Sequence, residues 1–297
     1  MKDFLKRPGV FAVLFAVVLI FADAFVILDT FVIPHSLGTV EEEEMPLITG
    51  EAVITQDSYS DDNIQISIKT IREYDTAIYI ADVQLSSAKY LQTALADDTF
   101  GTNITQKTSE TAEENGAVLA VNGDYYGANS RGYVIKNGVL YRDTVRRDSS
   151  YGDMVLYGDG LAGVIYEEEV SAQELADGGV SQLFAFGPVL VEDGEVKVTE
   201  ENEVGKAMAS NPRTAIGYIG PLHYIFLVSD GRTGESEGLS LFELAGVMRE
   251  YGCTFAYNLD GGGSSTMYFN GSVINNPTTN GRKISERAVS DIVYIGY

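Results

Sequence analysis

The sequence predicts an α+β protein: one domain with a mixed, mostly antiparallel sheet core and a few helices, behind an N-terminal transmembrane helix. Three observations support this fold class. Short β-like runs dominate, clear helix starts are few, and strand and helix patterns do not alternate regularly. An apolar segment precedes all of them. About 250 residues follow that segment, enough for one domain with a full core.

The N-terminal segment begins with basic residues and continues as an apolar stretch from Gly9 to Ile33. A membrane-spanning helix needs about 20 residues, and flanking basic residues remain in the cytoplasm. Residues 1–33 are therefore predicted to be a cytoplasmic tip and a single-pass signal anchor, with the domain extracytoplasmic. A signal peptide cleaved at Ala22-Asp23-Ala24 is the alternative, and it also exports the domain. Residues 34–50 are predicted to be an acidic stalk.

The remaining residues, 51–297, are predicted to form the domain. Ile64, Ile66 and Ile68 alternate with polar residues, which is the period of a half-buried strand. Similar patterns cover residues 77–85, 118–121, 134–141, 154–157, 183–198, 214–219, 224–228, 266–269 and 288–295. Ser171 with Glu174, and Ser240 with Glu243, are capping boxes that predict the starts of two helices.

Composition excludes several functions. The chain has 20 basic and 43 acidic residues, a net charge of −23, which argues against nucleic acid as a partner. The single cysteine, Cys253, excludes an intrachain disulfide and a CxxC zinc site. With only His35 and His223, an HExxH metal motif is absent.

The most informative motif is Asn258-Leu-Asp-Gly-Gly-Gly-Ser-Ser-Thr266, between two apolar runs. It predicts Asp260 at a strand end, followed by a glycine-rich hairpin turn. Consecutive glycines let backbone amides approach an anion, and hydroxyl groups add donors. A flexible turn without function is the alternative. The residues expected to touch a ligand here are Gly261, Gly262, Gly263, Ser264 and Ser265.

Three other polar clusters also lie at the ends of apolar strands, where sites are commonly assembled. The first contains Asn122, Asp124 as a possible acid, base or ligand, and Tyr125, which could stack on a sugar. The alternative is an ordinary Asn-Gly turn. The other two clusters contribute Arg213, whose planar fork suits a phosphate, and Asp230, which could equally be a turn residue.

Taken together, these motifs resemble the phosphodiester glycosidase family. The resemblance rests on Arg213-Thr-Ala-Ile-Gly217, Asp230-Gly231, Glu243-Leu-Ala245, Asn258-Leu-Asp-Gly-Gly-Gly-Ser264, Arg287-x-Val-Ser290 and the Asn122-Gly123 element with its two tyrosines. The motif-bearing part is residues 117–297. The resemblance implies hydrolysis of a sugar-1-phosphodiester, such as a GlcNAc-1-phosphodiester, in envelope or exopolysaccharide glycans.

The resemblance also implies roles. Arg213 and the glycine amides would hold the phosphodiester, with Arg287 as another anion contact. Asp260, with Asp124 or Asp230, would form the carboxylate pair of a glycosidase. No cofactor is expected. The alternatives are a non-catalytic carbohydrate-binding or envelope-assembly module, and a phosphodiesterase in which the three aspartates bind a divalent metal.

Overall fold

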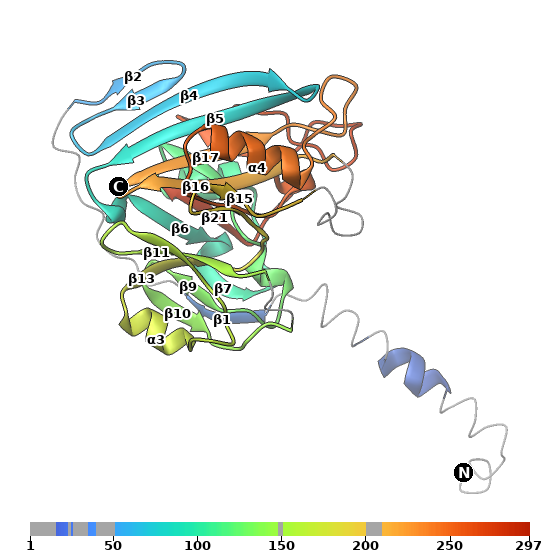
Figure 1. The fold of residues 1–297 in the computed structure, drawn as a ribbon. Helices are drawn as coiled ribbons and strands as arrows, with labels where there is room; N and C mark the ends of the chain where they lie inside the picture. Colours follow the sequence, from blue (N-terminus) through green and yellow to red (C-terminus); the bar gives the residue numbers. More distant parts are fainter. Residues whose placement is uncertain (1–15, 23–24, 26–34, 40–50, 148–150, 200–209) are drawn as a thin grey trace, which may run out of the picture.

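The computed structural model describes the chain except for residues 1–15, 23–24, 26–34, 40–50, 148–150 and 200–209 (Figure 1). Most of the predicted anchor, and residues 34 and 40–50 of the predicted stalk, therefore lie outside the described residues. The other residues of the predicted stalk, His35–Thr39, form a strand that pairs with residues 99–102. Within the predicted anchor, residues 16–22 are helical. Among the described residues, no helix is long and apolar enough to cross a membrane. The single-pass anchor stays a prediction.

The largest sheet has nine strands, and every pairing within it is antiparallel. Its order is β15 (Glu195–Val196), β14 (Val189–Glu192), β18 (Phe255–Asn258), β16 (Arg213–Gly220), β17 (His223–Ser229), β5 (Thr76–Leu85), β4 (Ile64–Glu73), β3 (Ser58–Ser60) and β2 (Val53–Ile54). The predicted alternation in β4 is confirmed, because Ile64 and Ile66 are buried while Gln65 and Ser67 are exposed.

A second, five-stranded antiparallel sheet packs against the first. Its order is β20 (Ser272–Val273), β19 (Met267–Phe269), β8 (Leu119–Asn122), β21 (Asp291–Ile295) and β6 (Leu91–Leu95). Val83 and Phe226 of the large sheet share one buried cluster with Val121 and Val293 of the smaller sheet. The main core therefore lies between the two sheets.

The outer faces of the two sheets are covered by helices. Helix α4 (Leu241–Glu250) lies along the large sheet near β16 and β17 (Figure 1), where Leu244 and Met248 pack in one cluster with Leu227. Helix α2 (Thr108–Glu114) contacts β8 and β21. It was not expected, because Lys107 stands at its N-cap in place of a residue that signals a helix start.

Smaller pairs and a three-stranded sheet complete the fold at the end away from β2 (Figure 1). The three-stranded sheet has the order β12 (Ala162–Ile165), β11 (Asp153–Tyr157) and β13 (Val180–Phe184). The pairs are β9 (Val134–Lys136) with β10 (Val139–Arg142), and β1 (His35–Thr39) with β7 (Thr99–Thr102). Helix α3 (Ala172–Asp177) contacts β10 and β13. Both predicted capping boxes are confirmed, at Ser171 and Ser240.

The glycine-rich segment after β18 differs from the expectation. It was predicted to be a hairpin turn, but β18 belongs to the nine-stranded sheet and β19 to the five-stranded sheet. The segment therefore crosses from one sheet to the other, with a short 3₁₀ turn at Gly262–Ser264. This crossing places its polar residues at the junction of the two sheets.

Candidate active site

Antiparallel pairing brings three of the sequence motifs to one rim of the large sheet. Arg213, the first residue of β16, is opposite Ser229 at the end of β17. On the other side of β16, Ala215 is opposite Asn258 at the end of β18. The residues that follow these strands, Asp230 and Asp260, therefore emerge at the same rim as Arg213.

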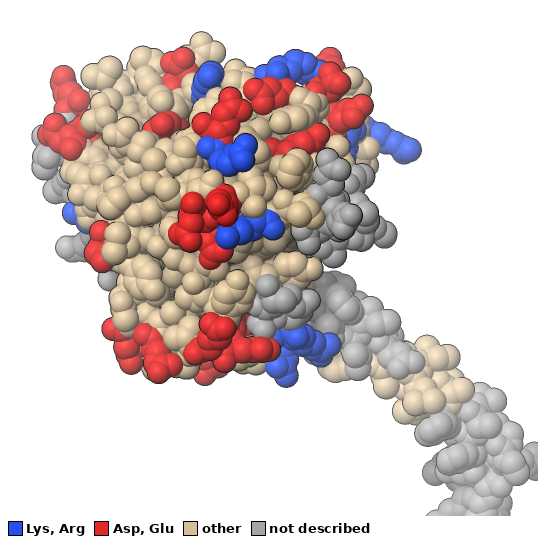
Figure 2. Space-filling model, in the orientation of Figure 1, with Lys and Arg blue, Asp and Glu red and all other residues tan. Residues whose placement is uncertain are grey.

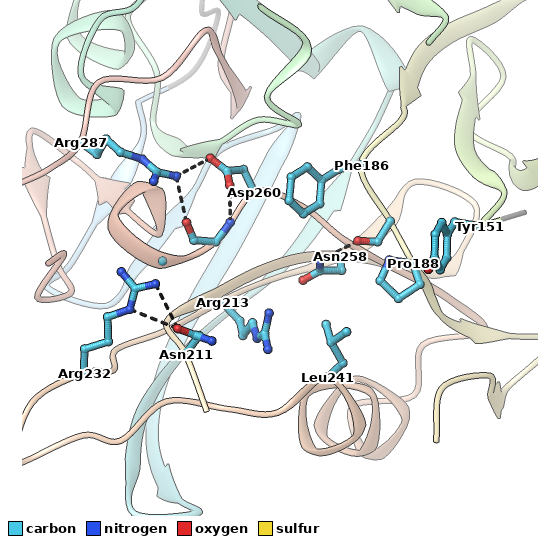
Figure 3. Close-up of a pocket in the computed structure, with 13 residues that line it drawn as sticks. Tyr151, Phe186, Pro188, Asn211, Arg213, Arg232, Leu241, Asn258, Asp260 and Arg287 are labelled. Carbon is cyan, nitrogen blue, oxygen red and sulfur yellow. Dashed lines mark hydrogen bonds and ion pairs between the residues drawn. The ribbon is translucent and has the colours of Figure 1, made fainter. Parts of the chain in front are cut away.

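A pocket of about 490 Å³ opens at this rim (Figure 3). Asp260 and Arg213 both line it, so the structure brings together the two residues on which the sequence interpretation most depended. The lining consists of Tyr151, Phe186, Gly187, Pro188, Asn211, Arg213, Arg232, Leu241, Asn258, Asp260, Gly261, Gly262 and Arg287. Among these, Asp260 is the one carboxylate, and three residues carry guanidinium groups.

The Asp260 carboxylate is held by donors on both oxygens. Oδ1 accepts a hydrogen bond from the Gly261 amide at 2.9 Å. Oδ2 accepts from the Ser264 hydroxyl at 2.7 Å and from Arg287 Nη2 at 2.8 Å. Arg287 also donates to the Ser264 hydroxyl from Nε and Nη2. The side chain of Asp260 is 11% exposed, so it reaches the pocket in a defined orientation.

Arg232 lies near Arg287 in the pocket, and its hydrogen-bond acceptors are uncharged. Its Nε and Nη2 donate to Asn211 Oδ1 at 3.1 and 3.0 Å, and Nη1 donates to the Thr279 carbonyl. Partial burial and the charge of Arg287 lower the pKa of Arg232. Arg287 is paired with the Asp260 carboxylate, whereas Arg232 donates to uncharged groups, so the positive charge of Arg232 favours an anionic ligand in the pocket.

Arg213 lines the pocket but is largely buried. It is 5% exposed, and its Nε donates to the Leu239 carbonyl at 2.9 Å. Its backbone amide donates to the Ser229 hydroxyl. A guanidinium fixed in this way presents a pre-oriented planar fork, which is the geometry that phosphate recognition uses.

Glycine is required where the turn passes beneath these arginines. Gly262 has φ +65°, and a Cβ there would lie 2.9 Å from Arg232 Nη2. Any other residue would be strained and would press on the guanidinium. Gly261 and Gly262 line the pocket, whereas Gly263 packs against Thr279 and does not.

Several residues expected to bind the ligand lie behind the pocket instead of lining it. Ser264 and Ser265 are fully buried, and Ser264 acts on Asp260 and Arg287 as described. The Asn122 side chain is also fully buried, and its Nδ2 donates to the Asp260 carbonyl at 2.7 Å. Tyr125 is 43% exposed and outside the pocket lining. Asn122 thus supports the backbone of Asp260 from below.

The two other candidate carboxylates also lie outside the lining. Asp230 is 4% exposed and accepts hydrogen bonds from the backbone and side chain of Asn276, from Asn275 and from Tyr79. Asp124 is 2% exposed and pairs with Lys136. A strand end predicts that a carboxylate is near the rim, but long-range contacts decide whether it faces the pocket.

The part of the chain that the structure describes contains no group of three His, Cys, Asp or Glu side chains able to hold a metal ion. The carboxylates of Asp124, Asp230 and Asp260, which the metal-dependent alternative needs together, contact different partners: Lys136, Asn276 and Arg287, respectively.

Sequence reasoning missed most of the uncharged wall. Tyr151, Phe186, Pro188 and Leu241 supply apolar surface (Figure 3), and Asn211 and Asn258 supply amides. Asn258 Nδ2 donates to the Gly187 carbonyl at 2.8 Å. Arg232 was not among the predicted site residues. Its position just after the Asp230-Gly231 motif was the available signal.

The two-sheet fold and its arginine-lined pocket define a class of protein. The chain belongs to the phosphodiester glycosidase family, whose profile matches residues 115–296. That stretch contains every pocket residue named above.

Individual relatives agree with this family. The SPbeta prophage-derived uncharacterized protein YomE of Bacillus subtilis (strain 168) is 31% identical over 201 residues, which are 67% of this chain and 31% of YomE. The N-acetylglucosamine-1-phosphodiester alpha-N-acetylglucosaminidase of Mus musculus is 28% identical over 183 residues, 57% of this chain and 35% of the mouse protein. This chain thus matches roughly a third of each relative's length.

Solved structures share the fold. The catalytic domain of the zebrafish N-acetylglucosamine-1-phosphodiester alpha-N-acetylglucosaminidase, auto-inhibited by its pro-peptide, superimposes with a TM-score of 0.63 at 19% identity, covering 90% of this chain and 89% of that one. A hypothetical protein from Synechocystis gives a TM-score of 0.56 at 14% identity, covering 79% and 62%. At these identities the likeness establishes the fold alone.

Proposed function

We propose that this protein is an extracytoplasmic glycosidase that hydrolyses sugar-1-phosphodiester bonds, of the GlcNAc-1-phosphodiester kind, in envelope or exopolysaccharide glycans. One observation carries the proposal: a single oriented carboxylate, Asp260, shares a pocket with the guanidinium groups of Arg213 and Arg232. A glycosyl phosphodiester needs both features, a carboxylate at the anomeric carbon and cations at the phosphate. The name of the mouse relative supports the same substrate class.

Asp260 is the reacting carboxylate in this proposal. Gly261, Ser264 and Arg287 all donate hydrogen bonds to its oxygens, which fixes the orientation of the carboxylate in the pocket. In Figure 3 its oxygens lie between the guanidinium of Arg287 and the ring of Phe186. In this role Asp260 is the nucleophile or base of the glycosidase mechanism, and Arg287 keeps it oriented.

The arginines take the phosphate. Arg232 and Arg213 neutralise the charge that grows on the phosphate oxygen as the bond to the anomeric carbon breaks. A phosphodiester is a far better leaving group than a sugar alkoxide, so a second carboxylate acting as general acid is not needed. This explains how a pocket whose described lining has one carboxylate can still perform the reaction.

The apolar wall accepts the uncharged part of the substrate. Phe186, Pro188 and Tyr151 lie opposite Arg232 in the pocket (Figure 3). The apolar face of a sugar ring packs well on such side chains, while amides such as Asn258 orient its hydroxyls. The overall charge of −23 disfavours long polyanions, and Figure 2 shows acidic side chains spread over one face of the molecule.

The test is release of free sugar from UDP-GlcNAc and from a simple alkyl GlcNAc-1-phosphodiester by the purified chain. We expect turnover, and we expect Asp260→Asn to lower kcat by about 10³-fold or more. Arg232→Met should lower kcat/KM by about 10- to 100-fold, the value of a hydrogen bond to a charged group. Arg282→Met is the matched control, because Arg282 is exposed and outside the pocket lining.

Two results would contradict the proposal. Full activity of Asp260→Asn would remove Asp260 from the mechanism. Tight binding of sugar phosphates without turnover, across both substrates and with Arg232→Met weakening the binding, would instead favour the non-catalytic carbohydrate-binding module.

A further inference from the structure

A cluster of three buried charges lies outside the pocket. Lys136 Nζ is 3.1 Å from Asp124 Oδ2 and 3.1 Å from Asp291 Oδ2. The three side chains are at most 2% exposed. They come from three places in the fold: the end of β9, the segment after β8, and the start of β21.

Such a cluster is a poor way to stabilise a fold. Removing three charges from water is costly, and a protein in which well-packed apolar residues replace such a cluster is often equally stable or more stable. Burial raises the pKa of Asp291 to about 6, although the Lys136 charge opposes this. Burial alone would lower the pKa of Lys136, but the two carboxylates more than offset it and leave the pKa raised. The cluster is therefore better explained by what it holds in place.

On one side the cluster holds the backbone of Asp260. The Asp260 amide donates to the Gly123 carbonyl at 3.2 Å, and the neighbouring Asn122 side chain donates to the Asp260 carbonyl. The Gly123 amide in turn donates to the Asp291 carbonyl at 2.8 Å. A Cβ on Gly123 would lie 2.2 Å from Asp291 Oδ1, so only glycine allows this approach.

On the other side the cluster holds the apolar wall. Asp124 Oδ2 accepts a hydrogen bond from the Ala185 amide at 3.1 Å. Ala185 directly precedes Phe186, whose side chain lines the pocket beside Gly187 and Pro188. Lys136 Nζ also lies 4.9 Å from the centre of the Phe184 ring. The Asp124 carboxylate thus contacts the segment that carries Phe186, and the neighbouring residue Gly123 accepts a hydrogen bond from the Asp260 amide.

We propose that Asp124 is a positioning residue: its carboxylate, anchored by Lys136, sets the distance between Asp260 and the Phe186 wall. The proposal rests on the proposed function for its kinetic consequence. It assigns to Asp124 a different role from the sequence expectation of a catalytic carboxylate, since Asp124 faces Lys136 and Ala185 and not the pocket.

The test compares three substitutions at one position in the full chain. Asp124→Asn keeps an acceptor for the Ala185 amide and leaves Lys136 paired with Asp291. It should retain kcat/KM within about tenfold, the cost of losing charge assistance on one hydrogen bond. Asp124→Ala removes the acceptor and should lose about 100-fold, as expected when the reacting groups are misplaced. Asp62→Asn, at an exposed carboxylate, is the matched control.

A second readout does not depend on turnover. The chain has no tryptophan, so Phe186→Trp places a single fluorescent reporter on the wall. Combined with Asp124→Ala, the reporter should emit at longer wavelength and be quenched more strongly by acrylamide than in the Phe186→Trp chain. Combined with Asp124→Asn, it should be unchanged. If the chain hydrolyses no glycosyl phosphodiester, the proposed function fails, and this emission alone decides the positioning role.

Two results would overturn the positioning role. One is an Asp124→Asn chain as inactive as Asp260→Asn with unchanged reporter emission, because Asp124 would then act in the chemistry. The other is an Asp124→Ala chain that keeps both its activity and its emission. Should the alanine variant not fold, Asp124→Leu replaces it, since leucine fills the volume but offers no acceptor.

Discussion

Asp153 begins β11, two residues after Tyr151 of the pocket wall, and its side chain is completely buried. Arg146 Nη2 lies 2.6 Å from its Oδ1. Burial raises the pKa of Asp153 from its ordinary 3.8 to about 8, Arg146 opposes the rise, and the nearby Glu167 carboxylate adds to it. Asp153 should therefore be protonated in the folded protein over a pH range in which it is ionised in the unfolded chain.

The sign of the effect on stability follows from proton binding. When folding raises the pKa of a carboxyl group, the group contributes fully to the free energy of unfolding at pH values below its unfolded pKa. This contribution is lost as the pH rises through the folded pKa. At about 1.4 kcal/mol for each pH unit, the interval from 3.8 to about 8 is worth about 6 kcal/mol. Between pH 5 and 8 the loss is about 4 kcal/mol.

Asp153→Asn isolates this contribution. An asparagine keeps the shape of the protonated carboxyl group and can donate to Glu167, but it does not ionise. Urea denaturation of both chains at pH 5, 6, 7 and 8 measures the free energy of unfolding. As the pH rises over this range, that of the variant should increase relative to that of the unsubstituted protein by about 4 kcal/mol. Asp62→Asn, at an exposed carboxylate, should show no such trend.

A difference in the free energy of unfolding between the two chains that is the same at every pH would refute the reasoning. It would mean that the ion pair with Arg146 keeps Asp153 charged throughout, so that attraction outweighs burial. A difference that shrinks with rising pH would refute the sign itself.

Three further substitutions test local geometry. Gly123→Ala should destabilise the fold by about 1–3 kcal/mol through overpacking, measured by urea denaturation, because its Cβ meets the Asp291 carboxylate. Gly262→Ala should weaken sugar phosphate binding by about tenfold in calorimetry through displacement of Arg232; unchanged affinity would contradict the contact. Ser171→Ala removes a helix cap remote from the pocket lining, so it should cost about 1 kcal/mol in thermal unfolding without changing kcat/KM.

Local patterns in the sequence were sufficient for much of the fold. The alternation from Ile64 to Ile68 predicted β4, and the serine-glutamate pairs predicted the starts of α3 and α4. These signals work because strand period and helix capping depend on residues only two or three positions apart. Helix α2 was missed because its start has no such signal.

The site was partly predictable for the same reason. Asp260 and Arg213 each adjoin a strand end within a distinctive motif, so the sequence indicated both. The apolar wall at Phe186 and Pro188 has no local signature in the sequence. These residues line the pocket because the fold brings them next to Asp260, which is far away in the chain.

By itself, then, the sequence determined many of the strands, two helices, the polar motifs at strand ends and the family, while strands such as β6 (Leu91–Leu95) and β7 (Thr99–Thr102) were not predicted. Only the tertiary structure decided that Asp260 faces the pocket while Asp124 turns inward to Lys136. It also decided that the glycine-rich segment joins two sheets. The physical reason is that burial, ion pairing and sheet packing depend on residues far apart in the chain, whose proximity no local pattern encodes.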